Sequence, residues 1–298
     1  MTAPTRTTAL SAAAGPSPAT DPSPATASSA ARGALAPIPS AASGIRPRLR
    51  GFAAERVFVR RSLILSLRDG ETLSMSIMLP VTLMLLFTFV FGGAIENDGS
   101  YVDYVVPGII LLCAGFGAAS TATYVSRDMS TGIIDRIRTM PLRPGSVLTG
   151  HVVASLARNL VSTAVVFGVA LLLGFRPSAG PLQWLAAFGV IAVYILVITY
   201  LYAAIGLAAG SPEAAAGYGF ILMFVPYLSS AFVPVHTMPT WLQWVAENQP
   251  ITPIIETIRG LLMGTPLHAQ PAWALGWCAV ILAISVLWGR WLFGRARR

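Results

Sequence analysis

Six long apolar stretches, separated by short polar segments, make up the pattern of hydrophobic and polar positions along this chain. They are residues 73–93, 104–124, 152–174, 182–204, 214–235 and 272–292. A helix needs about 20 apolar residues to cross the hydrocarbon core of a bilayer, and each stretch meets or approaches that length. The pattern therefore predicts an all-α membrane protein with six transmembrane helices.

Three residues interrupt the apolar pattern. Pro80 lies inside the first stretch, and Pro107 lies near the start of the second. A proline frees a backbone carbonyl one turn earlier, which a neighbouring helix can satisfy, so we expect both helices to continue. Arg158 is the one charge well inside a stretch. Because it lies about two turns from the basic loop that precedes it, we expect its side chain to snorkel to the cytoplasmic interface.

Composition supports a membrane protein and excludes several kinds of chemistry. The chain is 55% hydrophobic and only 11% charged, unlike a soluble domain. All 20 basic residues are arginine, so the chain has neither the lysine of a nucleotide-binding P-loop nor that of a Schiff base. It also contains no His-Glu-x-x-His or Gly-x-Ser-x-Gly motif. We therefore assign it no catalytic residue, metal or cofactor of its own, and any ATP chemistry must come from a partner.

The arginines fall mainly on one side of the predicted spans. Arg176 and Arg259 share the opposite side with the acidic loop 96–103. By the positive-inside rule, the arginine-rich side and both chain termini are cytoplasmic. The net charge of +8 then reflects topology and contact with anionic lipid headgroups, and not nucleic-acid binding. The arginines of the cytoplasmic side are Arg46, Arg48, Arg50, Arg56, Arg60, Arg61, Arg68, Arg127, Arg136, Arg138, Arg143, Arg290, Arg295, Arg297 and Arg298.

Polar segments flank the spans at both ends of the chain. Residues 1–44 are nearly all Ala, Pro, Ser and Thr, which predicts a disordered cytoplasmic tail. Residues 45–72 alternate helix formers with arginines and predict an interfacial helix, with a cytoplasmic extension of the first span as the alternative. Residues 293–298 form a basic cytoplasmic C-terminus.

The cysteines and histidines do not indicate a site. Cys113 and Cys278 each lie in an apolar run, where a lone cysteine behaves as a small hydrophobe, so we expect neither metal nor disulfide. His151, His236 and His268 all fall near the ends of predicted spans, and we assign them no role.

The first cytoplasmic loop between spans contains the sequence RDMSTGIIDRIRTMPLRP at residues 127–144. Apolar residues recur there at the helical spacing of positions 129, 133, 137 and 140. Asp128 lies near the positive end of the expected helix, and Pro141 stops it. An amphipathic helix of about three turns is unstable alone in water, so it must lie against a partner protein, the membrane surface or its own bundle.

A second polar segment, residues 233–264, lies on the outer side before the last span. It is too polar and too rich in proline to span, yet too apolar for a free loop, so we expect a hairpin of two short re-entrant helices. Trp241 and Trp244 are residues typical of a membrane interface. Thr252 and Pro253 predict the start of the second helix, as its N-cap and first residue.

The second helix of this hairpin also carries two charges. Gly264 is expected to end the helix. Glu256 and Arg259 are three residues apart and can pair on one helix face. Glu256 at membrane depth is a candidate functional residue, but an ion pair that only stabilises the hairpin is the alternative.

Three stretches make the chain resemble the membrane subunit of type-2 ABC exporters, the permease family that includes daunorubicin-resistance-type drug exporters and polysaccharide exporters. They are YVDYVVPGIILL at 101–112, RDMSTGIIDRIRTMPLRPGSVLTGHVVA at 127–154, and FVPVHTMPTWLQWVAENQPITPIIETIRGLLMG at 232–264. The similarity covers about residues 50–292 and leaves out the N-terminal tail.

This resemblance implies a half-transporter of a bacterial plasma membrane. It would form a homodimer or pair with a similar permease, and recruit a separate ABC ATP-binding subunit that holds ATP and Mg. In that family the loop after the second span carries a coupling helix that docks on the ATPase. The interfacial helix at 45–72 would be the family's connecting helix, and the outer hairpin its extracellular re-entrant helices. The residues placed at the ATPase contact would be Ile133, Ile134, Asp135, Arg136 and Ile137.

The resemblance also implies a class of substrate. The drug-resistance branch favours a hydrophobic drug or natural product, as in multidrug efflux and antibiotic resistance. A polysaccharide or lipid-linked glycan is the alternative within the family. A channel or secondary transporter is the alternative from another class, and it would place ionisable residues near mid-membrane. In this chain the ionisable residues nearest to mid-membrane are Arg158 and Glu256, and both lie near span ends.

Overall fold

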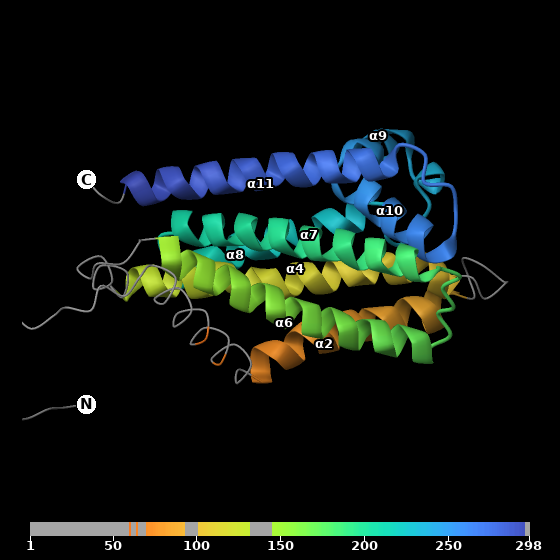
Figure 1. Cartoon of the computed structure of the whole chain (residues 1–298), viewed down its shortest axis with the longest axis horizontal. Coiled ribbons are helices and arrows are strands. Elements are labelled where there is room, and N and C mark those ends of the chain that lie inside the picture. Colours follow the sequence, from red (N-terminus) through yellow and green to blue (C-terminus); the bar gives the residue numbers. More distant parts are fainter. Residues whose placement is uncertain (1–59, 61–63, 65–69, 93–100, 132–144, 296–298) are drawn as a thin grey trace, which may run out of the picture. The chain divides into compact units, whose positions relative to one another are not determined.

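A computed structural model describes residues 60, 64, 70–92, 101–131 and 145–295, all within one unit that begins at Arg48. The described residues form a helical bundle (Figure 1). In this part of the chain, five helices are long and apolar enough to cross a membrane. They are α2 (Gly70–Leu85) with its π-helical continuation η1 (Leu86–Phe91), α4 (Tyr101–Ser130), α6 (Gly145–Leu172), α7 (Pro181–Ala208) and α11 (Gln270–Arg295). The all-α prediction is thus confirmed for these residues, as are five of the six predicted apolar helices.

Helix α4 lies at the centre of the bundle. It packs against α2, α6, α7, α8 (Pro212–Leu222) and α10 (Ile251–Met263), and most of its residues are buried. A helix that is hydrophobic all round is stable only where other helices or lipid surround it. Small residues allow the closest approach: Gly206 of α7 lies against the backbone of Ala122, where a Cβ atom would have no room.

The proline inside α2 shows how a neighbouring helix compensates for a lost hydrogen bond. Pro80 has no N–H, so the carbonyl of Ser76, four residues earlier, lacks its usual donor. The thiol of Cys113 on α4 donates to that carbonyl, with 3.4 Å between Sγ and O. Pro80 is therefore tolerated in the way the sequence predicts.

The predicted fifth span, residues 214–235, is not one continuous helix. Helix α8 (Pro212–Leu222) ends after 11 residues and is followed by the 3₁₀ helices η2 (Val225–Leu228) and η3 (Val235–Thr237). Pro226 is the physical reason, because it cannot donate to the carbonyl of Leu222 and its ring would clash there. The chain tightens before it, as the N–H groups of Met223 and Phe224 donate to carbonyls three residues earlier.

The segment that contains α8 and η2 nevertheless follows α4 along most of its length. Ala215 packs in one cluster with Ala118 and Ala122, near the C-terminal half of α4. Further along, the hydroxyl of Tyr101 at the start of α4 donates to the carbonyl of Phe232 at 3.0 Å. The chain thus passes from one end of the bundle to the other in two pieces.

Two short helices precede α11, as the sequence predicts. The second helix does not begin as expected, because Thr252 lies inside its first turn and does not cap it. Pro253 is the third residue of this helix, a position where the backbone N–H has no partner within the helix, so a proline is tolerated there. The Thr252 hydroxyl donates instead to the carbonyl of Ala246 at 2.6 Å, which ties the two helices together. Gly264 ends the second helix in the left-handed conformation, with φ of 69°. The helices are α9 (Thr240–Asn248) and α10 (Ile251–Met263).

Several sequence predictions fall outside the described residues. These are the disordered tail at 1–44, the expected coupling helix from residue 132 onward, and the end of the basic C-terminus at 296–298. Of the predicted connecting helix at 45–72, only residues 60, 64 and 70–72 are described, and the last three begin α2.

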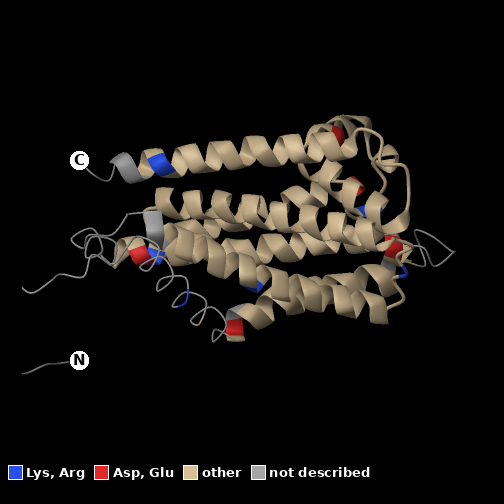
Figure 2. Ribbon diagram, viewed as in Figure 1, with Lys and Arg blue, Asp and Glu red and all other residues tan. Residues whose placement is uncertain are grey.

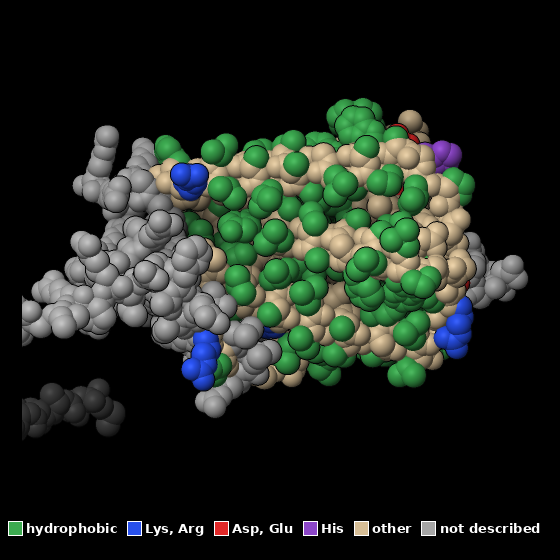
Figure 3. Space-filling model, in the orientation of Figure 1, with side chains coloured by type: hydrophobic (Ala, Val, Ile, Leu, Met, Phe, Trp, Pro, Cys, Tyr) green, Lys and Arg blue, Asp and Glu red, His purple; other side chains and the backbone are tan. Residues whose placement is uncertain are grey.

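The surface of the bundle divides into apolar sides and charged ends. Figure 2 shows that most charged residues lie near the two ends of the bundle, and Figure 3 shows hydrophobic side chains over the face between them. Met78 is 71% exposed and Leu287 is 66% exposed. Water would disfavour such contiguous apolar area, whereas hydrocarbon does not. The sides of the bundle therefore fit a bilayer.

Candidate functional site

The two ends of the bundle differ, and we name them by one residue each. At the Asp128 end, α4 finishes and α6 begins, on either side of the predicted coupling segment. At the Asp103 end, α4 begins, and the backbone N–H of Arg176, after α6, donates to Asp103 Oδ1 at 3.2 Å. Helices α9 and α10 also lie at the Asp103 end (Figure 1).

A histidine and an aspartate join α4 to α6 at the Asp128 end. His151 Nε2 lies 2.8 Å from Asp128 Oδ2. The predicted coupling residues 133–137 lie between these two in sequence, but outside the described residues. Asp128 and Met129 belong to the last turn of α4, so the predicted amphipathic helix does not begin there. The Asp128–His151 contact fixes the two flanks of the segment relative to each other.

Arg158 does not snorkel to the interface. Its side chain is 2% exposed and points into the bundle. Nη2 donates to the carbonyl of Gly117 at 3.0 Å and to the hydroxyl of Ser120 at 2.6 Å, both on α4. The guanidinium also lies over the ring of Tyr124, 5.8 Å from its centroid. The snorkelling prediction is wrong because Arg158 lies on the face of α6 that packs against α4, where hydrogen-bond partners are nearer than water.

Arg158 belongs to a buried polar stripe along α6. Its members recur at helical spacing, so they face the same neighbours. The Ser162 hydroxyl lies 3.1 Å from that of Ser76 on α2, and the Thr121 hydroxyl donates to Ser155 at 2.7 Å. Gly117 leaves room for the Asn159 side chain, which a Cβ atom would displace. The members of the stripe are Ser155, Arg158, Asn159, Ser162 and Thr163.

A second arginine joins three parts of the chain at the Asp103 end. Arg259 of α10 is 9% exposed, and its Nη2 donates to the carbonyls of Tyr104 and Ser230, each at 2.9 Å. Its Nη1 lies 2.6 Å from Glu256 Oε1, as the i,i+3 spacing predicts. The guanidinium carbon is 3.8 Å from the centroid of the Tyr104 ring. We call these four residues the Arg259 cluster.

The two outer tryptophans lie largely exposed on the surface of the bundle. Trp241 is 72% exposed and Trp244 is 70% exposed, one turn apart on α9. Exposed tryptophan side chains on a short helix are typical of the headgroup region of a membrane. Their depth in a membrane stays a prediction.

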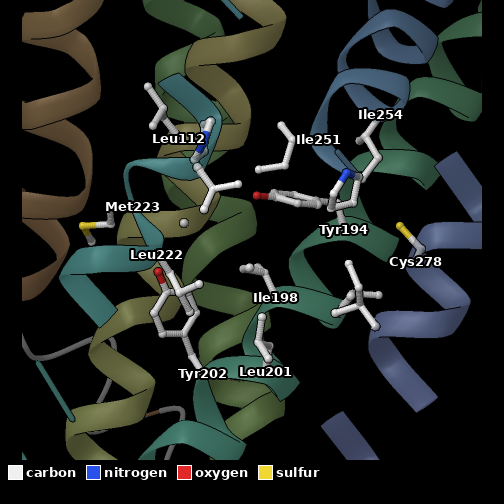
Figure 4. A pocket seen from close by; sticks show the side chains of 16 residues that line it. Leu112, Tyr194, Ile198, Leu201, Tyr202, Leu222, Met223, Ile251, Ile254 and Cys278 are labelled. Atoms are coloured by element: carbon white, nitrogen blue, oxygen red, sulfur yellow. The ribbon is translucent and has the colours of Figure 1, made fainter. Parts of the chain in front are cut away.

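An apolar cavity of about 140 Å³ lies where α8 ends and η2 begins. Its wall comes from α4, α7, the turn between α8 and η2, the start of α10, and α11. Figure 4 shows the side chains of Tyr194, Ile198 and Ile251 among those that surround it. Nothing in the sequence singled out this cavity, because its lining residues come from five distant segments of the chain.

The family model described as ABC-2 type transporter matches residues 54–263. The daunorubicin resistance ABC transporter permease protein DrrB1 of Streptomyces coeruleorubidus is 30% identical over 191 residues, which cover 63% of this chain and 68% of the relative. A protein named "Probable doxorubicin resistance ABC transporter permease protein DrrC", from Mycobacterium tuberculosis, is 27% identical over 248 residues, covering 78% and 90%. Doxorubicin resistance ABC transporter permease protein DrrB of the same organism is 26% identical over 258 residues, covering 77% and 86%.

Proposed function

Because this chain belongs to the ABC-2 type transporter family, we propose that it is the permease subunit of an ATP-driven exporter of hydrophobic drugs or natural products. The observation that carries the proposal is the extent of the similarity. Residues 54–263 match the family model, and the relatives named above are permeases of daunorubicin or doxorubicin resistance. The matched range includes both the predicted coupling segment and the two outer helices.

The apolar cavity supports a hydrophobic cargo. Its lining residues are almost all aliphatic or aromatic. A glycan would lose hydrogen bonds with water in such surroundings and gain few in return. A drug-like ring system makes few hydrogen bonds with water, so it would lose little on entering the cavity.

We further propose six crossings of a bacterial plasma membrane, with both termini in the cytoplasm. The sixth crossing is the two-piece segment of α8 and η2, which follows α4. The Asp128 end would be cytoplasmic and the Asp103 end extracellular, in keeping with the arginine distribution. Helices α9 and α10 would then form the re-entrant hairpin in the outer leaflet.

The proposed permease needs partners. ATP and Mg would be held by a separate ABC ATP-binding subunit, and residues 133–137 would dock on it. A second permease, identical or similar, would complete the transporter. ATP-driven closure of the two ATPase subunits would rotate the helices through the docked segments.

Purification and transport together test this proposal. Tagged chain purified from its source cells should bring an ABC ATP-binding subunit with it. Inside-out vesicles that contain both proteins should accumulate daunorubicin with ATP, and not with a non-hydrolysable analogue. Accumulation driven by an ion gradient in the absence of ATP would contradict the proposal and favour a secondary transporter.

The proposed topology predicts protease protection at the C-terminus. A reporter fused after Arg298 should resist external protease in intact cells, because the arginine-rich side is cytoplasmic. A reporter inserted between residues 93 and 100 is the matched control and should be cleaved. Cleavage of the C-terminal reporter would reverse the orientation and remove the coupling segment from the ATPase side.

Replacing Glu256 with Gln should change export by no more than about threefold. Glutamine keeps an oxygen acceptor for Arg259, and the Glu256 side chain is 33% exposed, so little desolvated charge is involved. Transport and membrane abundance should be measured in the same vesicles. A variant that reaches the membrane in normal amounts but does not transport would assign Glu256 to gating or to substrate.

A further inference from the structure

We propose that the cavity beside the α8–η2 break is a binding site, within one subunit, for an apolar molecule that carries one hydrogen-bond acceptor oxygen. A ketone or ester carbonyl on an aromatic or aliphatic body has this chemistry. Tyr194 would donate the hydrogen bond. The identification of this ligand with the exported compound rests on the proposed function.

The cavity lies at the break in the helix. The chain passes from α-helical to 3₁₀ hydrogen bonding around Met223, and residues on both sides of this change line the cavity. Gly115 of α4 also lines the cavity, and a Cβ atom built on it would have no neighbour within 4 Å. The empty space is therefore bordered by a residue without a side chain, near the middle of the central helix.

The hydroxyl of Tyr194 is the polar group that this cavity offers to a ligand. Tyr194 is 5% exposed and lines the cavity, and Figure 4 shows its oxygen pointing inward. It makes no hydrogen bond with the residues that the structure describes, whereas the nearby Tyr202 hydroxyl donates to the carbonyl of Gly219 at 3.1 Å. Because this oxygen borders the open space of the cavity, a molecule that enters the cavity can reach it and accept its hydrogen bond.

Water is a poor candidate for that partner. A buried water needs two to four polar neighbours, and the wall of this cavity is almost wholly apolar. An apolar ligand with one acceptor oxygen suits both the apolar wall and the Tyr194 hydroxyl. Its body replaces empty space against aliphatic side chains, and its oxygen accepts from Tyr194.

Size limits the ligand further. The cavity measures about 140 Å³, close to the apolar cavity of about 150 Å³ that accommodates benzene in another protein. It therefore holds one ring or a short chain segment. A larger cargo would place only one ring or one arm here.

Benzophenone is a suitable probe, because one of its two rings fits the cavity beside the ketone oxygen, and because it forms a covalent bond to nearby C–H groups when irradiated. The full chain, purified with its ATP-binding subunit, would be irradiated with benzophenone, and the labelled residues would be mapped by mass spectrometry. We expect labels on Ile198, Leu222, Met223 and Ile251, which surround the cavity.

Three variants test the site. Gly115→Leu should fill the cavity and abolish labelling there, while the better helix former keeps α4 folded. Gly189→Leu is the matched control, because Gly189 is exposed on α7 with open space around it, and its labelling should equal that of the unmodified protein. Tyr194→Phe should weaken binding about fivefold through loss of one hydrogen bond.

The outcomes separate the site from the identity of its ligand. Labels outside the cavity, or unchanged labelling in Gly115→Leu, would overturn the site. Competition of the label by a compound that the vesicles transport would support the cargo assignment. A lipid that co-purifies with the unmodified protein but not with Gly115→Leu, with no competition by cargo, would overturn that assignment and identify an acyl-chain site. Labelling needs no ATP, so failure of the proposed export function appears separately, in the vesicle assay.

Discussion

Changing Ile133 and Ile137 together to Ala is expected to release the ATP-binding subunit and to stop transport. The two residues are four positions apart, one turn of the predicted helix, and would fill a groove on the partner. Truncating a well-buried interface anchor commonly costs about 2 kcal/mol or more, which is roughly a thirtyfold loss of affinity. The measurement is recovery of the ATPase with tagged permease, at equal membrane abundance of the two forms.

A matched substitution separates docking from general damage. Val161 and Val165 are also four residues apart, but they are exposed on the side of α6, so their change to Ala should leave ATPase recovery intact. Arg136→Ala should give a milder defect that depends on salt, as a charge at the rim of an interface does. Undiminished recovery with the double isoleucine variant would place the segment on the membrane or on its own bundle.

Replacing Arg259 with Met is expected to destabilise the Asp103 end of the protein. The change removes donors to the carbonyls of Tyr104 and Ser230 and leaves Glu256 without its cation. Hydrogen bonds from a charged donor contribute about 1.5–3 kcal/mol each, so the loss of the two bonds to these carbonyls costs about 3 kcal/mol. Thermal unfolding of the purified protein should then occur roughly 10 °C lower.

Arg176→Met is the control for this prediction. Arg176 lies at the same end of the bundle, and among the described residues its Nη1 donates to carbonyls close to it in sequence, those of Leu171 and Phe175. Its loss should lower the melting temperature by a few degrees at most. Arg259→Lys should not restore stability, because one ammonium group cannot reproduce the planar fork that reaches both carbonyls. Equal melting temperatures for Arg259→Met and the unmodified protein would show that the cluster contributes nothing to folding.

The long helices could be predicted because run length and composition determine them. Five of the six apolar stretches form such helices in the described part of the chain. The sixth could not be distinguished by hydropathy, since residues 214–235 are apolar whether the chain is helical or bent. Pro226 was the residue in the sequence that could have indicated the break. Its surroundings differ from those of Pro80, which lies inside a continuous helix. At Pro80, Cys113 supplies the missing donor, whereas the chain before Pro226 tightens into i→i+3 hydrogen bonds.

The site was less predictable than the fold, for different reasons at different residues. Arg158 was judged by its distance from the basic loop, although the spacing of Ser155, Arg158, Asn159 and Ser162 already indicated a polar face. The contact between His151 and Asp128 spans 23 residues of sequence and depends on how α4 and α6 pack. The cavity depends on side chains from five segments, and no local pattern could reveal it.

The break between α8 and η2 has a mechanical consequence. The part before it is attached to α7 through Tyr202 and Gly219, and the part after it is attached to α4 and α10 through the carbonyl of Ser230. Pro226 prevents the segment from straightening into one rod. Relative movement of the two bundle ends would therefore bend the chain around Met223, whose side chain lines the cavity. Such a bend would change the space available to whatever occupies the cavity.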